Sequence, residues 1–180
     1  MVVDAVRQEL RWWTGETLRA RIPVSTSRYG LGARSGSNRT PPGWHRVAEH
    51  HGQGAPIGTV FRSREPVDHL PPTDWSQPDA PDAILSRIWW LAGEEPGVNN
   101  GEGIDSYARM IYLHGTNQEH LLGQPASIGC VRLANVAMIA LDRAVNPLDG
   151  LRVWIGAAPP DTHLFDMCLP PARGEGILHL

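Results

Sequence analysis

The stretch that decides the fold runs from residue 109 to residue 144 and reads RMIYLHGTNQEHLLGQPASIGCVRLANVAMIALDRA. Its first part, Arg109–His114, predicts a strand because bulky apolar residues alternate between the two faces of a sheet. Its last part, Val136–Ala144, carries apolar residues at helical spacing and predicts a helix. Asn135 is placed as a possible N-cap of that helix. The stretch therefore predicts a strand, a connecting loop and a helix.

Short elements separated by turns are expected in the rest of the chain. The 180 residues include 19 Gly and 16 Pro, which favours many turns and disfavours a helical bundle. Loops are predicted over residues 30–43 and 65–81, and residues 4–21 fit a helix or a strand equally well. The sum is a mainly β domain with one main helix. The predicted strands are Ile22–Tyr29, Trp44–Glu49, Gly58–Arg64, Ile84–Leu91 and Leu151–Ile155.

The composition excludes several classes of protein. Hydrophobic residues make up 41% of the chain, which excludes a disordered chain, and the net charge of −3 gives no electrostatic case for nucleic acid or a membrane surface. No apolar stretch approaches the roughly 20 residues that cross a bilayer, and no secretory signal is evident. If Met1 is the native start, we expect a cytoplasmic protein; an upstream signal would make it periplasmic.

Neither a disulfide nor a metal site is predicted. The two cysteines, Cys130 and Cys168, are expected to stay reduced in a reducing compartment, and Cys168 lies in a Pro-rich tail that suggests no reactivity. His45, His50 and His51 lack the HExxH or paired CxxC spacing of a zinc site. We therefore expect no metal and no cofactor.

A cysteine and a histidine carry the predicted chemistry. Cys130 is expected just before a helix, where exposed amides and the nearby Arg132 would favour the nucleophilic thiolate. Gly129 leaves its own amide and that of Cys130 free to receive an oxyanion. His114 lies at a strand end, where an imidazole can take and return a proton. Taken singly, such residues are more often a small buried hydrophobe and a structural histidine.

The motif HGT over His114–Thr116, followed by SxGCxRL over Ser127–Leu133, resembles the L,D-transpeptidase catalytic domain. This YkuD-type family contains cysteine acyltransferases and carboxypeptidases that act on peptidoglycan stems. Pro23–Thr26 and Asn38–Gly43 look like the early strand and loop of that domain. The resemblance implies an L,D-transpeptidase-like β-sandwich with one main helix after the cysteine. It divides the chain into an N-terminal segment (1–21), a catalytic domain (22–158) and a tail (159–180).

The resemblance also implies roles for individual residues. Cys130 would be the nucleophile, His114 its base, and the carbonyl of Gly115 the group that orients the imidazole. Arg132 would hold the terminal carboxylate of the substrate or order the loop behind Cys130, and Arg109 is a second candidate for that carboxylate. The remaining positions predicted to bind substrate are Ser127, Tyr112 and Thr116.

Within the family, four further stretches resemble a short cytosolic L,D-carboxypeptidase subgroup. Such enzymes remove the terminal D-alanine from murein tetrapeptides during peptidoglycan recycling, so a tetrapeptide or muropeptide is the expected partner. One alternative is an L,D-transpeptidase that forms cross-links or exchanges D-amino acids. Another is a non-catalytic muropeptide-binding module, because Ile128 stands where many members of the family have His. The four stretches are Tyr29–Gly32, Gly43–His45, Ile84–Gly93 and Leu122–Pro125.

Overall fold

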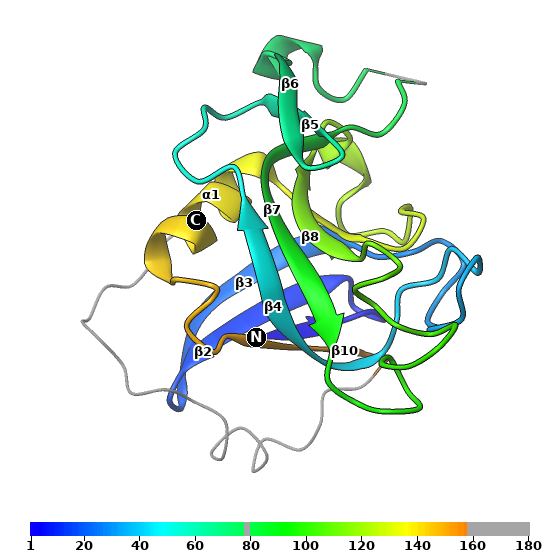
Figure 1. Cartoon of the computed structure of the whole chain (residues 1–180). Coiled ribbons are helices and arrows are strands. Elements are labelled where there is room, and N and C mark those ends of the chain that lie inside the picture. Colours follow the sequence, from blue (N-terminus) through cyan, green and yellow to red (C-terminus); the bar gives the residue numbers. More distant parts are fainter. Residues whose placement is uncertain (78–79, 158–180) are drawn as a thin grey trace.

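The computed structural model describes residues 1–77 and 80–157, and its main feature is a ten-stranded sheet (Figure 1). Besides the strands it contains the helix α1 (Asn135–Ala144) and two short 3-10 helices, η1 (Pro72–Asp74) and η2 (Glu119–Leu121). The strands are β1 (Val2–Asp4), β2 (Glu9–Thr14), β3 (Thr17–Ser25), β4 (Gly43–His51), β5 (Thr59–Arg62), β6 (Glu65–His69), β7 (Ile84–Gly93), β8 (Tyr112–Thr116), β9 (Val131–Leu133) and β10 (Arg152–Gly156).

The sheet closes on itself. Its strand order is β4-β10-β1-β2-β3-β9-β8-β7-β5-β6, and β4 also pairs with β7. Strand β4 pairs antiparallel with both β10 and β7, so hydrogen bonds connect the first strand in this order to a strand near the other end. The two layers of the predicted sandwich are therefore parts of one continuous sheet. The β5–β6 hairpin projects beyond this closed part (Figure 1). The prediction of a mainly β domain with one main helix is confirmed.

The main core fills the inside of the closed sheet. On β7, β8 and β9 the side chains of Leu91, Leu113 and Val131 are fully buried there, together with residues of α1. Strand side chains alternate between the two faces, so the neighbours of these residues point to the outer face. A second, smaller apolar cluster, which includes Trp90 and Tyr112, lies on that outer face. Side chains on the outer faces of β8 and β9 can therefore be held in place while the other faces of these strands stay anchored in the core.

Most predicted strands are present, and one predicted loop is partly wrong. The predicted strands Trp44–Glu49 and Ile84–Leu91 lie within β4 and β7. The predicted loop over residues 65–81 instead begins with β6, which forms a hairpin with β5. Ser63 and Arg64, with φ of 50° and 71°, make the turn. Proline is tolerated in an edge strand, because its missing N–H there costs no hydrogen bond of the sheet. A Pro-rich composition therefore does not exclude a strand such as β6.

The N-terminal segment is part of the sheet. The sequence left both helix and strand open for residues 4–21. These residues include the last residue of β1, all of β2 and most of β3. The predicted boundary between residues 21 and 22 falls inside β3, which runs on to Ser25 without a break. The predicted tail 159–180, which contains Cys168, lies outside the described residues.

The predicted helix is confirmed, but its predicted cap is wrong. Helix α1 begins at Asn135, and the N-cap position is occupied by Ala134. The Asn135 side chain is fully buried, where its Nδ2 donates to the carbonyl of Thr116 at 2.7 Å and its Oδ1 accepts from Ser86 Oγ at 2.7 Å. The Asn135 side chain therefore does not cap the helix. Its amide bonds Ser86 on β7 and Thr116 on β8, and so links α1 to both strands.

A buried ion cluster attaches α1 to the sheet. The carboxylate of Asp142 on α1 accepts from Arg87 Nε at 2.8 Å and from Trp89 Nε1 at 3.2 Å, both on β7. It also lies 2.5 Å from His50 Nε2 on β4. Arg87 is almost completely buried, so its positive charge needs the Asp142 carboxylate as a counter-ion.

We predict that Asp142→Ala lowers the free energy of unfolding by about 3 kcal/mol, because it leaves the Arg87 guanidinium buried without its counter-ion. Urea denaturation followed by tryptophan fluorescence measures this loss. The control is Asp149→Ala, an exposed aspartate just after the same helix, which should change the unfolding free energy by less than about 0.5 kcal/mol. Equal stability of the two variants would contradict the predicted role of Asp142.

Candidate active site

Cys130 is placed by the strand that follows it. Cys130 directly precedes β9, which runs parallel to β8, and the Tyr112 N–H on β8 points at the Cys130 sulfur with an N–S distance of 3.4 Å. The thiol in turn lies 3.5 Å from the carbonyl oxygen of Met110. The side chain is partly exposed and packs at the edge of the outer cluster with Trp90 and Tyr112. The sulfur is therefore held by the end of β8 and is still reachable from solvent.

His114 lies on the same outer face, one step along β8. In the register of the parallel pair, Leu113 faces Val131 and His114 faces Arg132, so residues 112, 114, 130 and 132 share one side. His114 Nδ1 lies 2.8 Å from the carbonyl oxygen of Gly115. A carbonyl only accepts hydrogen bonds, so Nδ1 carries the proton and Nε2 keeps its lone pair. The imidazole is thereby prepared to act as a base through Nε2.

Two glycines are required for this arrangement. A Cβ on Gly115 would overlap Asn135 Oδ1 and the carbonyl oxygen of Leu85, so any larger residue would displace β8 from its neighbours. Gly129 has a φ of 138°, which other residues rarely adopt. This conformation forms the turn that leads directly into Cys130.

Burial favours the neutral form of both groups. Burial, with a smaller contribution from the nearby carboxylate of Asp82, raises the pKa of the Cys130 thiol to about 11. Burial lowers the pKa of His114 below its usual value, although the same carboxylate opposes the shift. The predicted position of Cys130 directly before a helix is wrong, because β9 separates Cys130 from α1. The Arg132 charge, which was expected to favour the thiolate, is paired with Asp82 at 2.9 Å. The thiolate itself stays a prediction.

The turn before Cys130 is fixed by hydroxyl groups. Ser127 Oγ donates to the carbonyl of Cys130 at 2.6 Å and accepts from the Gly129 N–H at 3.2 Å. Thr40 Oγ1 donates to the Gly129 carbonyl at 2.9 Å, which joins the 30–43 loop to this turn. The Gly129 amide is thus already engaged, and the Cys130 amide remains the predicted oxyanion donor. Ser127 is 1% exposed, so its observed contacts are within the protein.

Arg132 makes structural contacts. Its guanidinium pairs with Asp82 and donates to Gln118 Oε1 at 3.0 Å, and the residue is 3% exposed. These contacts fit the second of its two predicted roles, which was to order the structure behind Cys130. Among the described residues, Arg132 Nε has no hydrogen-bond partner, so a contact with a substrate carboxylate stays a prediction.

Arg109 clamps the 30–43 loop. Its guanidinium donates to the carbonyl oxygens of Gly32 at 3.2 Å, Ala33 at 2.7 Å and Arg39 at 2.7 Å. Burial lowers its pKa, and the Cys130 side chain is close enough to act on it electrostatically. Arg109 therefore connects the loop to the site, while its predicted contact with a carboxylate is not tested by this geometry.

Tyr112 and Thr116 are both buried. The Tyr112 hydroxyl accepts from Arg64 NH1 at 3.3 Å, and Thr116 Oγ1 donates to Asp82 Oδ1 at 2.8 Å. Their predicted contacts with substrate remain predictions. Ile128, in contrast, is 58% exposed beside the turn, where it can neither donate nor accept a proton.

Asp82 is the residue that the sequence analysis missed. It binds both Thr116 and Arg132, and its charge acts on His114 and Cys130. It lies in a Pro-rich and Asp-rich stretch with no motif around it, so no pattern in the sequence indicated that it would approach β8 and β9.

The described ranges 1–77 and 80–157 contain no group of three or more His, Cys, Asp or Glu that could hold a metal ion. Within the same ranges, no helix is long and apolar enough to span a bilayer.

We predict that the alkylation rate of Cys130 by iodoacetamide keeps rising from pH 7 to above pH 10, because only the thiolate reacts and its pKa is about 11. Peptide mass spectrometry separates this reaction from that of Cys168. A short cysteine peptide, whose pKa is about 8.5, serves as the control and should level off near pH 9.5. A Cys130 rate that levels off together with the peptide would show that burial does not suppress the thiolate.

The chain is similar to one known protein family and to several solved structures. A family model described as YkuD, the L,D-transpeptidase catalytic domain, matches residues 1–155. No curated protein matches the sequence significantly. The three similar solved structures described next are only 14–16% identical to the chain, so they bear on the fold alone.

LD transpeptidase LdtMt1, solved in complex with imipenem, is 14% identical with a TM-score of 0.50, and the match covers 86% of this chain and 57% of that one. The Bdellovibrio bacteriovorus protein Bd1075 is 15% identical with a TM-score of 0.50, and the match covers 92% and 51%. An L,D-transpeptidase from Mycobacterium smegmatis is 16% identical with a TM-score of 0.49, and the match covers 87% and 57%. The chain thus spans less than two thirds of each relative.

Proposed function

Because the chain belongs to the L,D-transpeptidase catalytic domain family, known as YkuD, we propose that it is a cysteine acyl-transfer enzyme acting on peptidoglycan stems. We propose more specifically an L,D-carboxypeptidase that removes the terminal D-alanine from murein tetrapeptides. The observation that carries this proposal is the pairing of β8 with β9, which puts Cys130 and a histidine of fixed tautomer on one face.

The first half of the reaction uses the free nitrogen of His114. As the Cys130 sulfur attacks the carbonyl of the third residue, Nε2 takes the thiol proton, and the oxyanion is received by the Cys130 amide. The bond to D-alanine breaks, and the imidazolium returns the proton to the leaving amine. The Gly115 carbonyl, bonded to Nδ1–H, stabilises the imidazolium while it exists. The product is a thioester on Cys130.

The second half repeats these steps with water. His114 Nε2 takes a proton from water, the resulting hydroxide attacks the thioester, and the thiolate leaves and regains its proton from the imidazolium. A neutral resting pair suits this cycle. The thiol proton leaves on the amine of D-alanine, water supplies the proton that restores the thiol, and His114 is neutral again after each half.

The sequence supports hydrolysis over transfer to an amine. Tyr29–Gly32 and Leu122–Pro125 resemble the short L,D-carboxypeptidases, and the first of these stretches lies in the loop that Arg109 clamps near Cys130. An L,D-transpeptidase is the second candidate, favoured by the solved relatives whose names identify them as transpeptidases. The two reactions share the acyl-enzyme and differ only in the acceptor that resolves it.

We predict that the wild-type protein releases D-alanine from a disaccharide tetrapeptide and that Cys130→Ala lowers the rate by at least about a thousandfold, because no other group can form the thioester. Mass spectrometry of the muropeptide measures the loss. Cys168→Ala is the matched control and should keep the wild-type rate. Undiminished cleavage by Cys130→Ala would remove this cysteine from the mechanism.

An added D-amino acid acceptor separates the two candidates in the same experiment. A carboxypeptidase still gives the tripeptide as main product, whereas dominant exchange of the terminal residue would favour the transpeptidase.

The binding module is tested by covalent labelling. An activated cysteine with an oxyanion pocket should take up imipenem as a mass increase on Cys130, and a folded protein that neither reacts nor cleaves would favour the non-catalytic alternative.

We predict that the acid limb of kcat/KM has its midpoint below pH 6.5. The active form needs neutral His114, and burial disfavours the charged imidazolium, so the folded pKa is lowered and the base survives to lower pH. Initial rates of D-alanine release between pH 4 and pH 8 measure the limb, with circular dichroism as a control for folding. A midpoint above pH 7 would contradict a desolvated base.

A further inference from the structure

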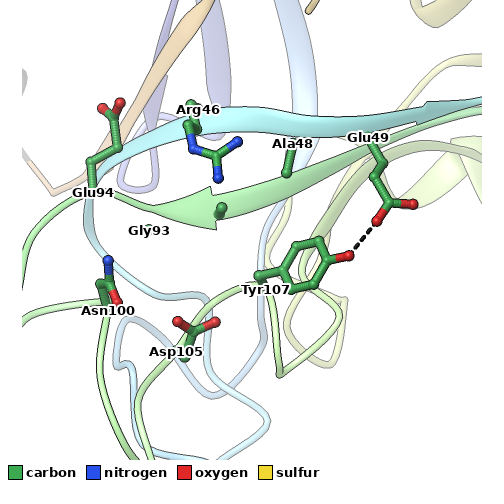
Figure 2. Close-up of a pocket in the computed structure, with 9 residues that line it drawn as sticks. Arg46, Ala48, Glu49, Gly93, Glu94, Asn100, Asp105 and Tyr107 are labelled. Carbon is green, nitrogen blue, oxygen red and sulfur yellow. Dashed lines mark hydrogen bonds between the residues drawn. The ribbon is translucent and has the colours of Figure 1, made fainter.

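A pocket on the outer face of the sheet lies apart from Cys130 and has no role in the proposed reaction. It has a volume of about 590 Å³ and lies between β4, the end of β7 and the segment that follows (Figure 2). Figure 2 shows Ala48 and Arg46 on β4 above the cavity, with Asn100, Asp105 and Tyr107 on the opposite wall. A volume of this size holds a ligand as large as a disaccharide.

The register of the sheet connects this pocket to the nucleophile. Glu49 on β4 faces Trp90 on β7, Trp90 faces Tyr112 on β8, and the Tyr112 amide contacts the Cys130 sulfur. Adjacent strands are spaced by 4.7–4.9 Å, so these three steps place the Glu49 end of the pocket about 14 Å from Cys130. The two sites therefore lie on one face, at opposite ends of one row of residues.

Aromatic and guanidinium groups occupy the row between the two sites. Tyr107 stacks on Trp90 with ring centroids 4.1 Å apart, and Trp90 meets Tyr112 edge to face. Arg64 lies 4.6 Å above the Trp90 ring and donates to the Tyr112 hydroxyl. A substrate that reaches from Cys130 to the pocket would cross this fixed surface.

The carboxylates of the pocket already have partners. Glu94 pairs with Arg152 at 2.6 Å, and Glu49 pairs with His51 at 3.0 Å and accepts a short hydrogen bond from the Tyr107 hydroxyl. Asp105 accepts from the Ala108 N–H at 2.8 Å. The pocket therefore offers many hydrogen-bond acceptors and donors, with Arg46 as a cation among its carboxylates, which suits a ligand rich in hydroxyl and amide groups.

We propose that this pocket binds the amino-sugar end of the substrate, so that the preferred substrate is a disaccharide peptide and not the free peptide. This inference rests on the proposed function, because the reacting carbonyl must lie at Cys130. Three peptide residues and the link to the sugar, taken as about four residue lengths, span about 13 Å when extended. That length matches the distance along the row. The sugar hydroxyls and acetamides would bond Asp105, Asn100 and Arg46, and Tyr107 would offer an aromatic wall.

The test compares two substrates and one ligand. The wild type should cleave the disaccharide tetrapeptide with a KM on the order of tenfold lower than the free tetrapeptide, at similar kcat, which is the effect of one or two net hydrogen bonds. In a separate titration by nuclear magnetic resonance, the peptide-free disaccharide N-acetylglucosaminyl–N-acetylmuramic acid should shift the amides of residues 46–49 and 100–107.

Two variants of the pocket and one control accompany the test. Asn100→Ala removes an exposed amide, and Ala48→Leu fills the cavity; each should raise the KM of the disaccharide substrate and weaken the shifts. Glu102→Ala changes an exposed residue of the same segment outside the pocket and should match the wild type.

The possible failures are distinct. Equal KM values for the two substrates, with no shifts from the disaccharide, would overturn the sugar site and leave the peptidase activity intact. Shifts in the pocket without cleavage of either substrate would overturn the proposed function and leave the sugar site standing.

Discussion

The parallel pairing of β8 with β9 is the constraint on which the site depends. Parallel neighbours cannot be joined by a tight turn, so residues 117–130 must leave β8 and return beside it. The return places Cys130 next to Tyr112 and one step from His114. The same strands bury Leu113 and Val131 on their other face, so the position of the outward pair is supported by the main core.

A desolvated site has a cost and a benefit. Burial favours the uncharged forms of both the thiol and the imidazole, which lowers the share of Cys130 present as thiolate. The same environment strengthens each interaction with charge that develops during the reaction. The charge of Asp82 raises the pKa values of both groups, and the charge of Arg132 lowers them. Burial is the largest influence on both pKa values.

Local patterns in the sequence predicted a large part of this arrangement. Alternation predicted parts of β3 and β8, a bulky apolar run between Pro81 and Gly93 predicted β7, and helical spacing predicted α1. The motif around Cys130 singled out the family and the residues for the proposed chemistry. Long-range packing defeated the remaining predictions. Asn135 leaves its capping role because its amide bonds Thr116 and Ser86, and the electrostatic state of Cys130 depends on burial that no spacing reveals.

The closed sheet has a consequence for how copies of the protein meet in a crowded cell. Each described strand except β6 has a hydrogen-bonded neighbour on both sides over at least part of its length, so little of the body of the sheet is left as a free edge for another chain to extend. The edge of β6 is exposed along its whole length, yet it carries Pro66, which lacks an N–H, and the charged Glu65 and Asp68. Such edges resist strand addition and amyloid-like aggregation. The hairpin can therefore protrude from the fold without becoming a point of self-association.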